Sequence, residues 1–99
     1  MFKIHSEIGL FQINFGGITL YAGLGSTHLC EAQYKTRVDG NFESANIEVE
    51  IVDSDSGDCM TREIWKEVFG EEIDDDVVGW VTPEQFAQLV SYLNERAKK

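Results

Sequence analysis

The chain has 99 residues, enough for one modest core, so we expect residues 1–99 to form a single domain. Apolar residues make up 42% of it, which excludes disorder throughout, and its formal net charge of −10 disfavours direct binding of nucleic acid. No apolar run approaches the roughly 18 residues of a membrane span, and the alternating N-terminal segment is unlike a signal peptide, so the sequence predicts a cytoplasmic protein with no membrane partner.

The first part of the chain alternates between apolar and polar residues with a period of two, which predicts β-strands. Such runs cover residues 2–8, 11–15 and 18–22. Gly16 and Gly17 separate the last two runs. Because tight hairpin turns need residues that tolerate a positive φ, this glycine pair predicts a hairpin.

A second hairpin is predicted around Asp39-Gly40, another favoured turn pair. It would join an alternating run at residues 28–38 to one at residues 45–51. With a two-residue turn, Cys30 lies opposite Val49, and apolar residues match along the ladder. This register favours a strand at residues 28–38, with a helix as the alternative.

The second half of the chain has the spacing of helices. Thr61 is placed to cap a short helix at about residues 61–69, which Gly70 would end. Residues 77–81 between the two helical segments fit either a short strand or a buried connector.

The last helix has the clearest sequence signals. Thr82 stands at the cap position, Pro83 at the first helical position and Gln85 three residues after the cap, the pattern of a capping box. Apolar residues then recur at helical spacing, which predicts a helix at about residues 83–97 with one face on a sheet. They are Phe86, Leu89, Val90, Leu93 and Ala97.

Together these elements predict an α+β fold. An antiparallel sheet of four to five strands at about residues 2–52 would be covered on one face by the short helix and the long C-terminal helix.

Two groups of residues in the sequence bear on metal binding. Residues 53–58 are similar to the start of a calcium-binding loop, but the sixth and twelfth positions hold Asp58 and Ile64 where an EF-hand needs glycine and glutamate. The four potential zinc ligands lack the tight spacing of structural zinc sites. They are His5, His28, Cys30 and Cys59. We therefore predict no metal and no other cofactor.

No catalytic residues are indicated. The glycines match no phosphate-binding loop, and Cys59 lies among acidic residues, which disfavour the thiolate. Carboxylates are plentiful, but acid–base catalysis needs two in different environments within a cleft. The two cysteines fit free thiols, with a Cys30–Cys59 disulfide as the alternative. The sequence predicts a protein that is not an enzyme.

The acidity is concentrated in one region. Residues 39–76 hold fourteen acidic residues against Arg62 and Lys66, a net charge of −12, whereas the segments on either side each carry +1. In the register above Glu31 would also face Glu48, and like charges across strands are destabilising. Solubility does not require such clustering, so we interpret it as a surface for a basic partner. The predicted partner-binding residues are Glu48, Glu50, Asp53, Asp55, Asp58, Glu71, Glu72, Asp74, Asp75 and Asp76.

The predicted function is therefore that of an acidic binding protein. It would act as an inhibitor that docks on the basic surface of a nucleic-acid-binding protein, in the manner of phage-type nucleic-acid mimics. One alternative is an immunity protein or antitoxin that neutralises a dedicated toxin. A further alternative is a weak calcium-binding module. The sequence does not determine the oligomeric state.

Overall fold

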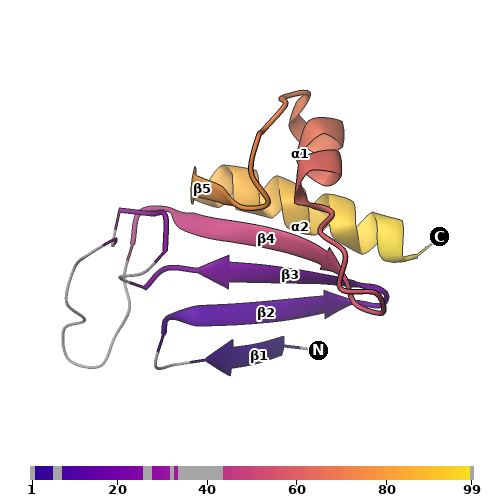
Figure 1. Cartoon of the computed structure of the whole chain (residues 1–99), viewed down its shortest axis with the longest axis horizontal. Coiled ribbons are helices and arrows are strands. Elements are labelled where there is room, and N and C mark those ends of the chain that lie inside the picture. Colours follow the sequence, from indigo (N-terminus) through magenta and orange to yellow (C-terminus); the bar gives the residue numbers. More distant parts are fainter. Residues whose placement is uncertain (1, 6–7, 26–27, 32, 34–43, 99) are drawn as a thin grey trace.

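The computed structural model describes residues 2–5, 8–25, 28–31, 33 and 44–98, which form a five-stranded antiparallel sheet and two helices (Figure 1). The strands lie side by side in chain order, from β1 to β5. This arrangement confirms the predicted α+β class. The elements are β1 (Phe2–His5), β2 (Leu10–Phe15), β3 (Ile18–Gly23), β4 (Ile47–Asp53), α1 (Thr61–Phe69), β5 (Val78–Val81) and α2 (Pro83–Ala97).

The glycine pair forms the predicted hairpin between β2 and β3. Phe15 pairs with Ile18 across it, and Gly16 has a φ of 63°. A positive φ at the first of two turn residues is the type II′ pattern, whose twist matches that of the flanking strands. β1 is shorter than the predicted run at residues 2–8, because it ends at His5, whose carbonyl accepts from the Ile8 backbone N–H at 3.2 Å.

The strand predicted at residues 28–38 is wrong in the part that is described. Residues 28–31 and 33 form bends and turns, while Asp39-Gly40 and the rest of the segment lie outside the described residues. β4 pairs instead with β3, so that Val49 faces Ala22 rather than Cys30. The fifth strand is β5, whose Val81 pairs with Ile47 on the other side of β4. Alternation alone did not distinguish β3 from residues 28–38, because both offer a period-two apolar face.

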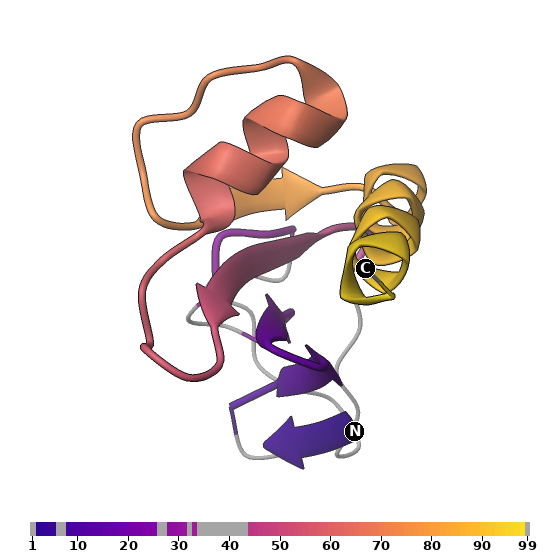
Figure 2. The same ribbon diagram turned by 90° about the vertical axis from the view of Figure 1, so that its right-hand side faces the viewer.

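The hydrophobic core lies between the sheet and the two helices. Leu20, Val49 and Ile51 point from β3 and β4 toward buried residues of both helices and of β5. The buried core cluster comprises Ile18, Leu20, Val49, Ile51, Ile64, Trp65, Val81, Leu89 and Leu93. Seen from the end, the helices lie toward β4 and β5, and β1 lies at the far side of the sheet (Figure 2). The opposite face of the sheet carries more polar side chains.

The capping box of α2 is confirmed. The Thr82 hydroxyl accepts from the Gln85 backbone at 3.2 Å, and the Gln85 side chain accepts from the Thr82 backbone at 3.0 Å. Of the predicted apolar stripe, Leu89 and Leu93 are buried, whereas Ala97 is exposed. No helix in the described ranges is long and apolar enough to cross a membrane.

The start of α1 differs from the prediction. Met60 occupies the N-cap position without a side-chain hydrogen bond, and Thr61 is the first helical residue. At the other end Gly70 adopts the left-handed conformation and terminates the helix as predicted, with a φ of 69°.

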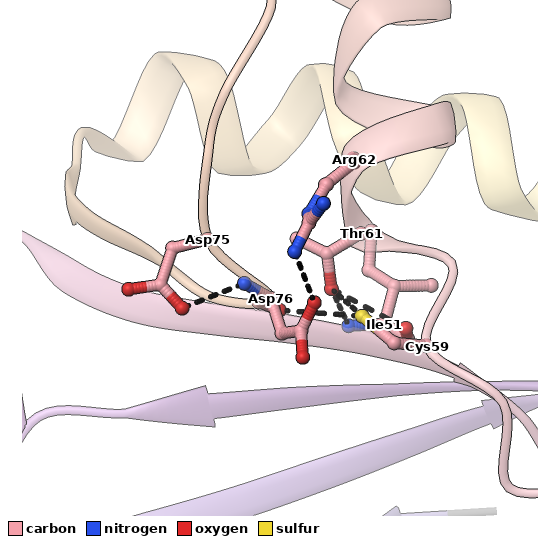
Figure 3. Close-up of polar contacts among 6 residues, drawn as sticks. All are labelled: Ile51, Cys59, Thr61, Arg62, Asp75 and Asp76. Atoms are coloured by element: carbon pink, nitrogen blue, oxygen red, sulfur yellow. Dashed lines mark hydrogen bonds and ion pairs between the residues drawn. The ribbon is translucent and has the colours of Figure 1, made fainter.

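Thr61 does not cap the helix because its hydroxyl completes β4. The hydroxyl oxygen accepts from the Ile51 backbone N–H at 2.9 Å and lies 3.3 Å from the Ile51 carbonyl, to which it donates (Figure 3). β5 pairs only with Ile47 and Val49, so this part of the β4 edge lies beyond its reach. Met60 adds a backbone donor to the same carbonyl, and Cys59 forms a bridge to Val52.

We expect Thr61→Val, which keeps the shape but removes the hydroxyl, to lower the free energy of unfolding by about 1–3 kcal/mol. The reason is that Thr61 is fully buried and the Ile51 N–H would lose its partner. Urea denaturation followed by circular dichroism measures the change. Ser91→Ala removes an exposed hydroxyl on α2 and serves as the control. Equal stability of the Thr61 and Ser91 variants would contradict the role given to this hydroxyl.

Candidate functional site

Two of the predicted acidic residues, Glu48 and Glu50, lie on the face of β4 that is turned away from the helices. They alternate with Val49 and Ile51, which point into the core. Both are half-buried. Glu48 uses one carboxylate oxygen to accept from the Leu29 backbone N–H at 3.0 Å, so it helps to hold residues 28–31 against the sheet.

Glu31 does not face Glu48 as the predicted register required. Its backbone N–H donates to the side-chain oxygen of Asn46 at 2.6 Å, and its carboxylate accepts from the Ala45 backbone at 3.2 Å. The expected repulsion across strands at this position is therefore replaced by hydrogen bonds.

Glu50 is in a different electrostatic situation. Partial burial raises the pKa of its carboxyl, and the negative charges of Asp76 and Glu48 raise it further. Within the described residues this carboxylate has no hydrogen bond and no ion pair. Tyr21 lies directly opposite it on β3. We refer to Glu48, Glu50 and Asp76 as the Glu50 cluster.

Asp76 joins this cluster from a distant part of the sequence. Its carboxylate lies 3.1 Å from the Arg62 guanidinium on α1, and its carbonyl accepts from the Cys59 thiol at 3.5 Å (Figure 3). Its own N–H donates to the Asp75 carboxylate at 2.7 Å. These contacts fix the end of the α1–β5 connection beside β4. Arg62 thus pairs with the cluster at Asp76, and no cation in the part of the chain that the structure describes pairs with Glu50.

The remaining acidic residues of the α1–β5 connection are of two kinds: some contact α1 and others are exposed. Glu71 accepts from the Trp65 indole at 3.1 Å. Glu72 pairs with Lys66 at 2.7 Å, and this contact lowers the pKa of the Glu72 carboxyl and raises that of the Lys66 amine. Asp74 and Asp75 are exposed. Two acids therefore hold the connection to α1, and two extend into solvent.

Asp53, Asp55 and Asp58 form a separate acidic turn at the other end of β4. The Asp53 carboxylate accepts from the backbones of Asp55 and Ser56 at 2.9 and 3.0 Å, and these bonds lower the pKa of its carboxyl. Strand alternation turns Asp53 to the opposite face from Glu50. Asp55 and Asp58 are exposed. The ten predicted acids thus do not make one row, but a cluster, a connection and a turn.

Two tryptophans near this surface, Trp65 and Trp80, differ clearly in burial. Trp65 is only 2% exposed, and its ring packs on Phe69 with centroids 4.2 Å apart. Trp80 on β5 is 52% exposed and has a positive φ of 52°. Its backbone N–H donates to the Leu29 carbonyl at 2.8 Å, so one residue links Trp80 and Glu48. Gly79 permits this approach, because a Cβ there would lie 2.6 Å from the Leu29 Cβ.

Tyr21 is the site residue that sequence reasoning missed. The sequence places it in the first predicted hairpin, and its position beside Glu50 follows only from the pairing of β3 with β4. Testing residues 45–51 against every alternating run, rather than against the nearest run in sequence, would have offered this register as a candidate.

The arrangement provides binding groups rather than reactive ones. Cys30 is buried and Cys59 exposed, and both are free thiols. In the described part of the chain, no three His, Cys, Asp or Glu side chains are grouped so that they could hold a metal ion.

Comparison of the chain with protein-family models, with curated proteins and with solved structures found no match in any of the three.

We expect Glu50→Gln to stabilise the protein at pH 7, by less than about 1 kcal/mol because the group is partly exposed. The pKa of Glu50 is raised in the folded state, so its ionised form disfavours folding and this penalty grows as pH rises through that pKa. Urea denaturation at pH 7 and at pH 3.5 measures the effect, which should vanish at the lower pH. Asp74→Asn in the α1–β5 connection also removes one negative charge, at an exposed position outside the helices, and should leave stability nearly unchanged. A destabilised Glu50→Gln at pH 7 would contradict the unfavourable setting of this carboxylate.

We expect millimolar calcium to leave the thermal midpoint unchanged. The Asp53 carboxylate already accepts two backbone N–H groups, and the turn lacks the bidentate glutamate of a calcium loop. Differential scanning fluorimetry with calcium, and with magnesium at equal ionic strength, makes the comparison. A rise specific to calcium that Asp53→Asn abolishes would favour the calcium-binding alternative instead.

Proposed function

We propose that this protein is a non-enzymatic acidic binding protein that docks the Glu50 cluster on the basic surface of another protein. The observation that carries the proposal is Glu50 itself, a half-buried carboxylate beside two others, for which the described residues supply no cation. Folding alone gains nothing from this arrangement, because like charges brought together are destabilising. A lysine or arginine from a partner would relieve it.

Aromatic side chains support this surface as an interface. Trp80 is exposed and connected through Leu29 to Glu48, and Tyr21 lies opposite Glu50. Tryptophan and tyrosine are enriched among residues that dominate binding energy, and both bind arginine through their ring faces. The surface therefore combines negative charge with aromatic contact area, which suits an arginine-rich partner.

A nucleic-acid-handling protein is the partner that we favour. Its binding groove already presents arginine and lysine to phosphates, so a folded acidic surface competes directly for the same groups. Complementary charge would accelerate association more than it would add affinity. In this form of the proposal the protein is an inhibitor that mimics nucleic acid.

Affinity capture from a lysate of the source organism tests the proposal. We expect the immobilised protein to retain basic proteins at about 50 mM salt and to release them at about 500 mM, because exposed charges are screened. Excess duplex DNA or RNA should also release them if the nucleic-acid groove is the docking site. Capture of one protein that nucleic acid does not displace would favour the immunity-protein alternative.

Matched variants make the test specific to the Glu50 cluster. The triple variant Glu48→Gln, Glu50→Gln and Asp76→Asn keeps the hydrogen-bond acceptors but removes three charges, and we expect at least a tenfold loss of capture. The control variant removes three exposed charges from the helices instead. It combines Glu67→Gln, Glu84→Gln and Glu95→Gln. Equal capture by both variants would refute the assignment of the surface.

Trp80→Asn tests the aromatic contribution separately. Asparagine tolerates the positive φ at this position, so the variant removes the ring without adding strain. We expect weaker capture with an unchanged thermal midpoint. Full retention of capture would exclude Trp80 from the interface while leaving the charge-based test intact.

A further inference from the structure

β1 forms one edge of the sheet. It is the first strand in the order β1-β2-β3-β4-β5, so its outer side has no strand neighbour in the described part of the chain. Strand edges present unpaired N–H and C=O groups that readily pair with another strand. This edge lies at the far side of the sheet from both helices (Figure 2).

The side chains of β1 are unusually apolar for such an edge. Phe2 is 75% exposed and Ile4 is 74% exposed. Their cross-strand neighbours are Ile13 and Phe11, so they continue the apolar face of the sheet beyond the cover provided by α2. Of the helix residues, Phe86 reaches Phe11 on β2, with ring centroids 6.1 Å apart.

The devices that normally protect an edge strand are nearly absent from β1. Proteins prevent edge pairing with prolines, bulges and charged side chains. Lys3 is the one charged residue in the sequence of β1, β2 and β3. Four residues, Phe2 to His5, are paired in regular register with β2.

The distribution of charge favours a second copy of the chain as the partner that pairs with β1. The net charge of −12 lies in residues 39–76, whose described acids belong to β4, α1 and their connections. A basic partner would be attracted there and not to β1. A second copy of the chain, in contrast, meets the least repulsion at β1, because pairing there keeps the two acidic regions at opposite ends.

We propose that β1 is a homodimerisation edge, through which two copies pair antiparallel to form one continuous sheet of ten strands. A two-fold axis normal to the sheet makes the contact self-complementary and places Phe2 and Ile4 of both copies on one face. With Ile4 opposite its own copy, Lys3 faces His5 of the second copy rather than a second lysine. This inference is independent of the proposed function.

Sedimentation velocity and light scattering of the full chain, from about 1 to 500 µM, test the proposal. We expect the mass to rise from 11.2 kDa toward twice that value. Raising the salt from about 50 to 500 mM should strengthen the dimer, because it screens repulsion between two negative copies. Capture of a basic partner should respond to salt in the opposite sense, so failure of one proposal is distinguishable from failure of the other. A monomer at the highest concentration and salt would overturn the dimer and leave the edge to a strand of a different protein.

Variants and amide exchange locate the contact. Ile4→Lys places a charge on the edge at an exposed position, and we expect at least a tenfold weaker dimer. The thermal midpoint should be unchanged at about 1 µM, where the wild type is monomeric and dimerisation does not contribute to stability. Gln88→Lys adds the same charge on the exposed face of α2 and should dimerise like the wild type. In the wild type, amide exchange of residues 2–5 should slow as concentration rises. A dimer whose β1 exchange does not depend on concentration, or that Ile4→Lys does not weaken, would overturn the proposal.

Discussion

The outer edge of β4 is the constraint on which the rest of the structure depends. β4 is an interior strand that lies between β3 and β5, and its backbone groups must be paired on both sides, because buried unpaired N–H and C=O groups are costly. β3 satisfies one side along six residues. The other side is shared between the short strand β5 and the segment that enters α1, where the Thr61 hydroxyl takes the place of a strand partner. The chain after β4 therefore contacts β4 twice, first at the start of α1 and again at β5.

The acidic cluster is a consequence of this double return. The segment that enters α1 places Arg62 and Cys59 beside β4, and the approach to β5 brings Asp76 against both of them. Asp76 thereby becomes a neighbour of Glu50, although 26 positions separate them in the printed sequence. Arg62, which the described part of the chain places beside them, is engaged with Asp76. The unpaired charge of Glu50 is thus fixed by the same contacts that complete the sheet, which is why we regard it as a property of the fold.

The two edges of the sheet differ in surface chemistry: one is acidic and the other is apolar. At the β4–β5 edge, carboxylates and an exposed tryptophan lie around strands whose backbone N–H and C=O groups form hydrogen bonds with side chains and turns. At the β1 edge, the strand is regular and nearly uncharged, and the apolar side chains of Phe2 and Ile4 are exposed. A single sheet can therefore offer one surface governed by charge and one governed by apolar contact and backbone pairing. The two surfaces respond oppositely to salt, since screening weakens attraction to a basic partner and also weakens repulsion between copies.

The sequence by itself determined the features whose causes lie within a few residues. The type II′ turn follows from Gly16-Gly17, the start of α2 from Thr82, Pro83 and Gln85, and the end of α1 from Gly70, because backbone freedom and local hydrogen bonds act over one turn. Only the tertiary structure decided which strand pairs with β4, what Thr61 binds and that Asp76 joins Glu50. Period-two alternation marks the face of a strand but not its neighbour, and residues 18–22 and 28–38 carried that pattern equally well. Which strand pairs with β4 depends on how the whole core packs. The regional acidity was therefore visible in the sequence, whereas the position of Glu50, with no cation beside it among the described residues, was not.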